Sequence, residues 1–507
     1  MSKNYPWLAF VLSLVSGSLG CGGGSGGGSD AGRVDAARVD GGSDVDSSFD
    51  VDSGSSADAG GDARSPSDAG GDARVPPVVT PSVCADRGAE IVAATGNTIS
   101  VSPAGDGQVT VDGATRSLRQ VVSDASAGDT ILLDDGTYTL PSASGGSYTG
   151  LYFTTANVTL RSASGDPSAV VIDSAYRSMG GESAAITVAA PGVVLANFTV
   201  KRSVFHLIHL WAAADATVVH NVRLIDAGQQ FLKSSPGGSE TVDGVEVGCS
   251  QFFMTAEGRD NVWGYGAQDG STTCYTGGID THGARSWQVH DNSFEGIYCN
   301  ADGVQRPAHG MSPDVRGGMT YTGGLSEYAI HMWDAEAGNG HVIERNRIIN
   351  CARGIGLGMR TDVYDTVIKN NMVFSEHPGS REHDVGIAVE RAHNTQVDNN
   401  TVIFTSGAAY GNAIEYRWDV TSGLSVRNNL TNQRIRARNG ATATTSNNIT
   451  DASPSWFRDA ATGDLHLASC DEARVVGAGT VLPSVTLDVD AEARGSSNDI
   501  GADDCAP

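Results

Sequence analysis

A three-residue phrase that begins with Ile or Leu recurs along residues 208–448, and a turn containing Asn or Ser recurs with it. The phrases are Ile208-His209-Leu210, Leu232-Lys233-Ser234, Ile279-Asp280-Thr281, Ile330-His331-Met332, Ile355-Gly356-Leu357, Ile387-Ala388-Val389, Ile414-Glu415-Tyr416 and Ile435-Arg436-Ala437. The turn residues are Asn197, Asn221, Ser250, Asn292, Asn346, Asn371, Asn400, Asn429 and Asn448. Alternation of apolar and variable positions is typical of strands, and a repeat of roughly 20 to 30 residues is typical of a solenoid. Residues far apart in sequence are then stacked in columns.

The segment before the repeats predicts a covered end of the coil. Residues 117–125 place Leu118, Val121 and Val122 at helical spacing, and the strand-like segment GDTILLDDGTY follows at residues 128–138. An amphipathic helix at this point would cover the exposed strand edges of the first turn.

The helix, the GDTILLDDGTY segment, the phrases and the Asn turns together resemble the right-handed parallel β-helix, or pectin-lyase-like, superfamily over residues 95–450. The resemblance implies an all-β fold, a right-handed parallel β-helix solenoid with an N-terminal capping helix. Residues 488–494 and 498–503 are similar to closing segments of bacterial members, which implies a C-terminal cap. The superfamily includes polysaccharide lyases, hydrolases, epimerases and non-catalytic adhesins, so the resemblance does not decide the chemistry.

The Asn residues of the turns are interpreted as structural. Asn tolerates the left-handed backbone conformation that a tight corner needs. Its side-chain amide can also bond to the Asn of the next turn, as in stacked amide ladders. We expect one Asn column to have both properties.

The middle residue of each phrase points outward, because strand side chains alternate between two faces. This gives a first outward column of His209, Lys233, Asp280, His331, Gly356, Ala388, Glu415 and Arg436. A second column, two residues further on, is Trp211, Ser235, His282, Trp333, Gly358, Glu390, Arg417 and Arg438. Neighbouring strands lie about 4.8 Å apart, so Lys233, Asp280 and the histidines of both columns are expected to form one cluster.

Insertions mark the same face of the predicted coil. The two longest stretches between a turn and the next phrase, residues 250–279 and 292–330, fall just before the rungs that carry Asp280 and His331. Long loops at one corner of a rigid scaffold usually build a binding wall. Gly356 and Gly358 on the following rung are expected to leave an open floor beside that wall.

The residue types of the cluster fit polysaccharide cleavage by β-elimination. A polysaccharide lyase needs a base for the proton next to a uronate carboxylate and a cation for the charge that develops. Lys233 is the candidate base and His282 or His331 its proton partner, while Asp280 favours the charged form of Lys233 or orients a histidine. The candidate substrate-binding residues are His209, Trp211, Trp333, Arg360 and Arg417.

Two outward carboxylates on adjacent rungs, Glu390 and Glu415, are candidate ligands for Ca²⁺, which prefers oxygen. The alternative is a surface ladder in which they pair with Arg417 and bind nothing. A hydrolase would need two or three carboxylates facing one bond, and the glycine rung separates Asp280 from the other two acids. Elimination is therefore preferred to hydrolysis or epimerisation.

A second class of function fits the same face. A non-catalytic glycan-binding or adhesive solenoid would use the aromatic rungs Trp211 and Trp333 without any need for a reactive Lys or His. Convergence of Lys233, His282 and His331 within a few ångströms would favour the enzyme, and scattered side chains would remove that argument.

The first residues are expected to form a secretory signal followed by a tether. Lys3 and the short apolar run of residues 7–15 resemble a bacterial secretory signal, residues 1–20, followed by a lipidated Cys21. Residues 21–83 are rich in Gly, Ser and Asp and are expected to be a disordered tether. Residues 84–450 are assigned to the β-helix and 451–507 to the C-terminal cap. We expect an exported outer-membrane or cell-surface lipoprotein, or otherwise a secreted protein.

The net charge indicates which partners to expect, and the cysteines indicate disulfides. A net charge of −26 argues against nucleic acid or an anionic membrane surface as the main partner, so we expect polysaccharide as the partner and the lipid anchor as the contact with a membrane. Capped solenoids are commonly monomers, and we expect a monomer here. Eight cysteines in an exported chain make disulfides plausible. We expect Cys249 to pair with Cys274 and Cys470 with Cys505, and one thiol to remain unpaired if Cys21 is acylated.

Overall fold

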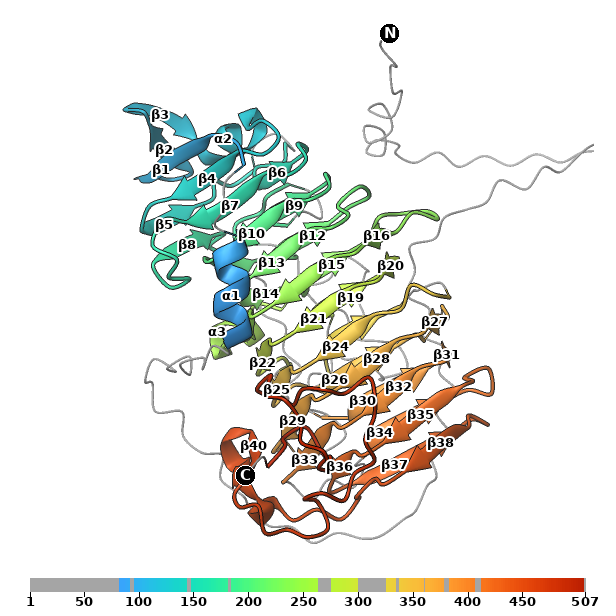
Figure 1. Ribbon diagram of the computed structural model, residues 1–507. Helices are drawn as coiled ribbons and strands as arrows, with labels where there is room; N and C mark the ends of the chain where they lie inside the picture. Colours follow the sequence, from blue (N-terminus) through green and yellow to red (C-terminus); the bar gives the residue numbers. More distant parts are fainter. Residues whose placement is uncertain are drawn as a thin grey trace, which may run out of the picture. The chain divides into compact units, whose positions relative to one another are not determined.

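The computed structural model describes residues 82–91, 95–143, 147–180, 184–262, 275–299, 325–333, 337–359, 361–377, 383–405 and 412–505. In these residues three long sheets surround a common core (Figure 1). Sheet 1 has the order β3 (Ala114–Ser117), β2 (Gln108–Val111), β1 (Thr98–Gly105), β4 (Thr130–Leu133), β7 (Thr159–Ser162), β10 (Val194–Ala196), β13 (Val218–His220), β17 (Glu246–Gly248), β21 (Gln288–His290), β24 (Val342–Glu344), β28 (Val367–Lys369), β32 (Gln396–Asp398), β35 (Leu424–Arg427) and β38 (Ala443–Ser446).

In the other two long sheets the strands follow one another in chain order. Sheet 2 is β5 (Gly136–Thr139), β8 (Val170–Asp173), β11 (Thr199–Ser203), β14 (Arg223–Ala227), β18 (Gln251–Phe253), β22 (Ser293–Glu295), β25 (Arg347–Ile349), β29 (Met372–Ser375), β33 (Thr401–Phe404) and β36 (Leu430–Thr431). Sheet 3 is β6 (Leu151–Phe153), β9 (Ile186–Val188), β12 (Ile208–Leu210), β15 (Gln230–Ser234), β19 (Gly277–Thr281), β23 (Tyr328–Met332), β26 (Arg353–Leu357), β30 (Val385–Glu390), β34 (Asn412–Arg417) and β37 (Arg434–Arg438). Apart from the antiparallel start β1–β2–β3, the described pairings of these sheets are parallel, which confirms the predicted parallel β-helix.

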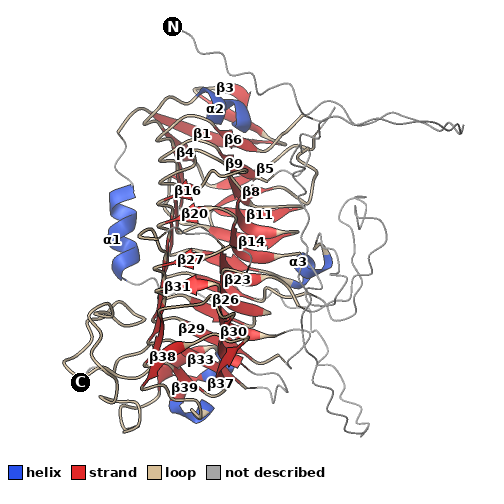
Figure 2. Cartoon of the chain, turned by 90° about the vertical axis from the view of Figure 1, so that its right-hand side faces the viewer, coloured by secondary structure: helices blue, strands red, loops and turns tan. Residues whose placement is uncertain are grey.

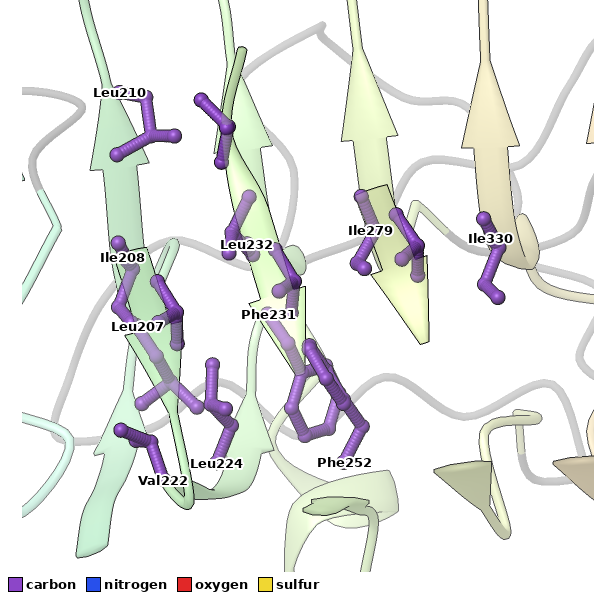
Figure 3. Packing of buried hydrophobic residues seen from close by; sticks show 14 of the residues in the cluster. Leu207, Ile208, Leu210, Val222, Leu224, Phe231, Leu232, Phe252, Ile279 and Ile330 are labelled. Atoms are coloured by element: carbon purple, nitrogen blue, oxygen red, sulfur yellow. The ribbon is translucent and has the colours of Figure 1, made fainter. Parts of the chain in front are cut away.

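Each coil of the chain supplies one strand to each long sheet, as β13, β14 and β15 do in succession. The first apolar residue of every phrase points into the core, and Ile208, Leu232, Ile279 and Ile330 lie opposite one another on consecutive strands of sheet 3 (Figure 3). All four are fully buried. Burial of an Ile or Leu side chain contributes about 1.5–3 kcal/mol, so this repeated column stabilises every coil.

At the corner between sheets 1 and 2, the Asn residues that we expected in one column occupy two adjacent positions. Asn197 and Asn221 in the first position have both expected properties, since φ is positive at each and Nδ2 of Asn221 donates to Oδ1 of Asn197 at 2.8 Å. The first position has a left-handed backbone, with φ of +61° at Asn197 and +54° at Asn370. The second forms the amide ladder: Nδ2 of Asn371 donates to Oδ1 of Asn400 at 2.9 Å, and Nδ2 of Asn400 donates to Oδ1 of Asn429 at 3.0 Å. The single predicted column is therefore wrong, since Asn197 belongs to the first position and Asn371 to the second.

Smaller elements lie at the ends and corners of the coil (Figure 2). The helices are α1 (Ser82–Ile91), α2 (Leu118–Asp124), α3 (Ala256–Asp260) and the 3₁₀ turns η2 (Pro454–Trp456) and η3 (Ala460–Thr462). The short strand pairs are β16 (Val242–Asp243) with β20 (Ala284–Arg285), β27 (Val363–Tyr364) with β31 (Ala392–His393), and β39 (Phe457–Asp459) with β40 (Asp464–Leu467). None of the helices in the described ranges is long and apolar enough to span a bilayer.

The helix expected near residues 117–125 is α2, and its apolar face joins the main core. Ser117 caps its first turn by accepting from the backbone N–H of Gln120, and Leu118, Val121 and Val122 are buried. At the other end, the C-terminal segment packs against the outer face of sheet 2, where apolar residues of β39 and β40 form a second core with those of β29, β33 and β36.

Two disulfides fix the flanking segments. Cys470 bonds to Cys505, which confirms that prediction. Cys249 bonds to Cys84 of α1, so its predicted pairing with Cys274 is wrong. Helix α1 therefore lies against the outside of sheet 1, where Arg87 also forms an ion pair with Glu246 of β17 (Figure 1). The free cysteine among the described residues is the buried Cys351.

Candidate active site

The first outward column lies on sheet 3 in the predicted register. Backbone pairing aligns His209 with Lys233, Lys233 with Asp280, and Asp280 with His331. It then continues through Gly356, Ala388, Glu415 and Arg436. Stacking of the coils thus brings residues from four successive phrases side by side.

A buried ion pair forms the centre of this column. Nζ of Lys233 contacts Oδ2 of Asp280 and donates to Nε2 of His282 at 2.9 Å. Nδ1 of His331 lies 3.5 Å from Oδ1 of Asp280. Lys233 and Asp280 are only 4% and 3% exposed, whereas 40% of the His282 side chain is exposed. The structure therefore brings together all four residues predicted to be catalytic.

The cluster has a defined charge pattern. Burial alone would raise the pKa of Asp280, but Lys233, His282 and His331 outweigh it and hold that pKa well below its usual range. Asp280 is thus an anion, and Lys233 in contact with it is an ammonium group. Burial lowers the pKa of His331 to about 4, although Asp280 opposes the shift. Nε1 of Trp333 donates to Nδ1 of His331 at 2.7 Å, which places the proton of the neutral ring on Nε2.

Aromatic rings line the same face. The ring of Trp333 lies 4.7 Å from that of His282 and 5.0 Å from that of His331, measured between centroids. Trp211 is 40% exposed and its ring lies 4.4 Å from that of His209. Both predicted tryptophans therefore lie beside the outward column, as an aromatic platform for sugar would require.

The open floor expected at Gly356 and Gly358 is wrong. The ring of Tyr328 lies over Gly356, where an added Cβ would be 2.9 Å from three ring carbons. At Gly358 the backbone has φ of +74°, and an added Cβ would lie 1.8 Å from the carbonyl oxygen of Glu390. Glycine at these positions makes room for a ring and a tight turn rather than for a ligand.

Tyr328 belongs to a third outward column that the sequence pattern does not reveal. It pairs with Arg353, and its ring centroid lies 4.8 Å from that of His331. An added Cβ on Gly354 would lie 3.2 Å from the Val373 side chain in the core, so the residue before Ile355 also points inward. Because two successive residues point inward there, simple alternation misplaces Tyr328.

Glu327 is a further residue that the sequence analysis missed. Burial raises the pKa of this carboxyl group to about 7, with Arg353 and Lys233 opposing the shift and Asp280 adding to it. An added Cβ on Gly277 of β19 would lie 2.9 Å from the Cβ of Glu327. Glu327 lies outside every phrase, and burial, which produces the shift, is visible only in the folded chain. A carboxyl group that is half protonated near neutral pH is a candidate general acid.

The carboxylates of Glu390 and Glu415 take part in an ion-pair ladder. Arg417 donates to Glu390 at 3.1 Å and Arg438 donates to Glu415 at 2.9 Å. The second oxygen of each carboxylate accepts from a neutral N–H donor, at 3.0 and 2.6 Å. Because every oxygen already has a donor, this set does not fit Ca²⁺ without displacement of both arginines. Calcium dependence stays a prediction, and the ladder also occupies Arg417, which was expected to bind substrate.

The remaining predicted residues are placed as follows. His209 lies on the first outward column, next to Lys233. Arg360 and Cys21 lie outside the described residues.

The sheets and their parallel pairings define the fold as a parallel β-helix with one polar outer face. Among solved structures, the chain is similar to pectate lyase Pel9A, with 15% identity, a TM-score of 0.39 and coverage of 82% of this chain and 98% of that one. It is also similar to a rhamnogalacturonan lyase, with 12% identity, a TM-score of 0.39 and coverage of 80% and 96%, and to XylC with xylose, with 10% identity, a TM-score of 0.37 and coverage of 74% and 66%. No protein-family model and no curated protein matches. These values are too low to assign a reaction.

Buried neutral histidines predict a loss of stability in acid. Burial lowers the pKa of His383 to about 4, with its ring against Phe404. Between pH 6.5 and 4 the unfolded chain therefore binds a proton that the folded chain does not, and folding becomes less favourable as the pH falls. Urea denaturation should show this as a difference between the wild type and His383→Leu. As the pH falls from 6.5 to 4, the unfolding free energy of the wild type should drop by about 3 kcal/mol relative to that of the variant.

His466 supplies a control of opposite sign. Although burial opposes it, hydrogen bonds to Asp490 and Asp464 raise its pKa. Its contribution is therefore complete below pH 6.5 and is lost as the pH rises through the raised pKa, so His466→Leu should differ most from the wild type in acid. Equal pH profiles for the wild type and the His383 variant would contradict a neutral buried His383.

Proposed function

We propose that the outer face of sheet 3 binds a uronate-containing polysaccharide and cleaves it by β-elimination at Lys233, Asp280, His282 and His331. The observation that carries the proposal is the buried Lys233–Asp280 ion pair with the half-exposed His282 bound to it. A buried ion pair rarely adds to stability, and perturbed ionisable groups gathered on one face are typical of functional sites. The outward direction of the column supports a role toward a ligand rather than toward the core.

The arrangement suits each step of an elimination. The Lys233 ammonium group binds the uronate carboxylate and stabilises the negative charge that develops on it. When substrate binds, the Lys233 ammonium group donates its hydrogen bond to the substrate instead of to Nε2 of His282. This nitrogen can then accept the proton from the carbon next to the carboxylate. The C–H electron pair forms the new C=C bond, the C–O bond to the neighbouring sugar breaks with its electron pair on oxygen, and a proton from His282 or water completes the leaving hydroxyl.

In this mechanism His282 is the base, a role for which the sequence favoured Lys233. The reason is the direct contact between Lys233 and the anionic Asp280, which keeps a cation where the developing charge needs one. Asp280 is then a positioning residue that acts through Lys233. His331 contributes a neutral ring that Trp333 holds in place.

Hydrolysis is the second candidate reaction, because of Glu327. Glu327, whose pKa is raised to about 7, and the ionised Asp280 are two carboxyl groups whose pKa values are pushed apart, a pattern found in glycoside hydrolysis. Asp280 is engaged by Lys233, which leaves it less able to activate water. Elimination therefore remains the better fit.

A substrate screen tests the proposal. The full-length protein is incubated with a panel of uronate-containing polysaccharides, with and without Ca²⁺, and the absorbance of unsaturated products is followed. We expect at least one substrate to yield product, and Lys233→Ala and His282→Ala to lower kcat/KM by about 10²–10⁴-fold. Arg436→Ala, at the far end of the same column, is the matched control and should retain activity. Retention of glycans on a column without any product would support the non-catalytic binding alternative instead.

We also propose that the protein is exported and held at a membrane by lipid on Cys21, and that it acts as a monomer. The signal-like residues 1–20 and the Cys that follows them support this. Metabolic labelling with a fatty acid should mark the wild type and not Cys21→Ala. Label on both would contradict the anchor.

A further inference from the structure

The first outward column continues beyond Lys233 toward the start of the coil with uncharged residues. Backbone pairing aligns His209 with Thr187 and Thr187 with Tyr152. Tyr152 and Trp211 expose 38% and 40% of their surface on this part of the sheet. Since neighbouring strands lie about 4.8 Å apart, these residues form a track along β6, β9 and β12 that ends at the charged cluster.

Two side chains near the cluster end of this track are buried without hydrogen-bond partners. The amide nitrogen and oxygen of Gln230 make no hydrogen bond although the residue is 0% exposed. Nε2 of His209 is also unpaired, and His209 is 5% exposed. Buried polar groups are nearly always paired, so unpaired ones next to an outward-facing cluster point to a polar ligand. An amide offers both a donor and an acceptor, which suits a hydroxyl group.

The described part of this track is electrically neutral. Burial lowers the pKa of His209 well below its usual range. Burial, together with Lys233, lowers the pKa of His206 to about 3, and the ring of His206 lies 5.0 Å from that of His209. Arg119, a cation near the start of sheet 3, already donates to the backbone carbonyls of residues 148 and 150. The described track itself therefore offers no cation to a second carboxylate.

We infer that the neutral track of Tyr152, Thr187, His209 and Trp211, with Gln230 of β15 beside its cluster end, binds uncharged sugar residues, so that the substrate is a heteropolysaccharide in which a uronate is joined to neutral sugar. This inference rests on the proposed function, because it takes Lys233 as the uronate site. The ring face of a neutral sugar packs on Trp211, and its hydroxyl groups reach Gln230 and His209. A homopolymer of uronates would instead place carboxylates along the track, where the described residues offer no cation to pair with them.

The test compares two classes of polymer and one aromatic variant. Polygalacturonate and alginate represent homopolymers, and rhamnogalacturonan and hyaluronan represent alternating polymers of a uronate with an uncharged sugar. We expect kcat/KM to be at least about tenfold higher for an alternating polymer, and Trp211→Ala to lower it about tenfold on that polymer alone. Trp456→Ala, in the C-terminal segment, is the control and should change neither value. Equal cleavage of both classes, or an equal loss on both in Trp211→Ala, would overturn the inference.

A binding measurement separates this inference from the proposed elimination. If no polymer is cleaved, calorimetry with neutral gluco-, manno- and xylo-oligosaccharides still tests the track. Binding that weakens about tenfold in Trp211→Ala would uphold the track while the elimination fails. Absence of binding by every neutral oligosaccharide, with or without binding of polygalacturonate, would overturn the track.

Discussion

Asp280→Ala is expected to lower the free energy of unfolding by about 3–5 kcal/mol, because it leaves the ammonium group of Lys233 buried and unpaired. The pair is almost fully buried, so solvent does little to screen the lost interaction. Urea denaturation at neutral pH measures the effect. The double variant Lys233→Met/Asp280→Leu should regain most of the stability, since two apolar side chains of similar size do not need a partner charge.

An exposed ion pair provides the control for this prediction. Asp451 pairs with Arg474, and their side chains are 70% and 52% exposed. Asp451→Ala should unfold at nearly the same urea concentration as the wild type. If Asp280→Ala behaved like Asp451→Ala, or if the double variant were no more stable than the single one, Lys233 and Asp280 would not form a buried ion pair.

Asn371→Ala is expected to have a comparable effect through the corner of the coil. Oδ1 of Asn371 accepts both the backbone N–H and Nδ2 of Asn346, at 3.0 Å each, and its own Nδ2 donates to the next Asn of the ladder. The substitution strands buried donors on Asn346, and each unpaired group costs about 1–3 kcal/mol, which gives a loss of about 3–5 kcal/mol of unfolding free energy.

The last rung of the ladder serves as the comparison. Asn448 accepts from Asn429 in the same way, but it is partly exposed and water can replace its bonds. Asn448→Ala should therefore destabilise clearly less than Asn371→Ala in the same urea series. Equal losses at the two positions would show that the buried ladder bonds do not set the stability of the corner.

The sequence predicts the register of sheet 3 because the Ile or Leu of each phrase has to point into the core. A slip by one residue would turn the whole apolar column toward solvent, so the apolar pattern specifies the pairing strongly. Once Ile208, Leu232, Ile279 and Ile330 are aligned, the outward column follows without further information. That is why the cluster around Lys233 could be predicted although its members lie on different coils.

The Asn turns show why periodicity alone was insufficient at the corners. Several turns carry two consecutive Asn residues, such as Asn370-Asn371 and Asn399-Asn400. Asn suits both the left-handed position and the ladder position, so residue type does not distinguish them. Only the backbone shows φ of +54° at Asn370 while the side chain of Asn371 makes the ladder bonds.

Features that depend on long-range packing could not be predicted from the sequence, for a different reason. The Cys84–Cys249 bond joins residues 165 positions apart, and nothing in the spacing says where α1 lies on the coil. Tyr328 over Gly356 depends on a local break of alternation before Ile355. The raised pKa of Glu327 comes from burial, which periodicity does not report for a residue outside the phrases.

The mass of the released oligosaccharides tests the central claim most directly. Elimination at the Lys233 cluster yields an unsaturated fragment that is lighter by one water than the saturated oligosaccharide of the same length, because no water enters the reaction. We expect such fragments from the wild type and from Arg436→Ala, and we expect their loss in Lys233→Ala and His282→Ala. Fragments that have gained a water would instead indicate hydrolysis with Glu327 as the acid, and unsaturated fragments from all four proteins would contradict a reaction at this cluster.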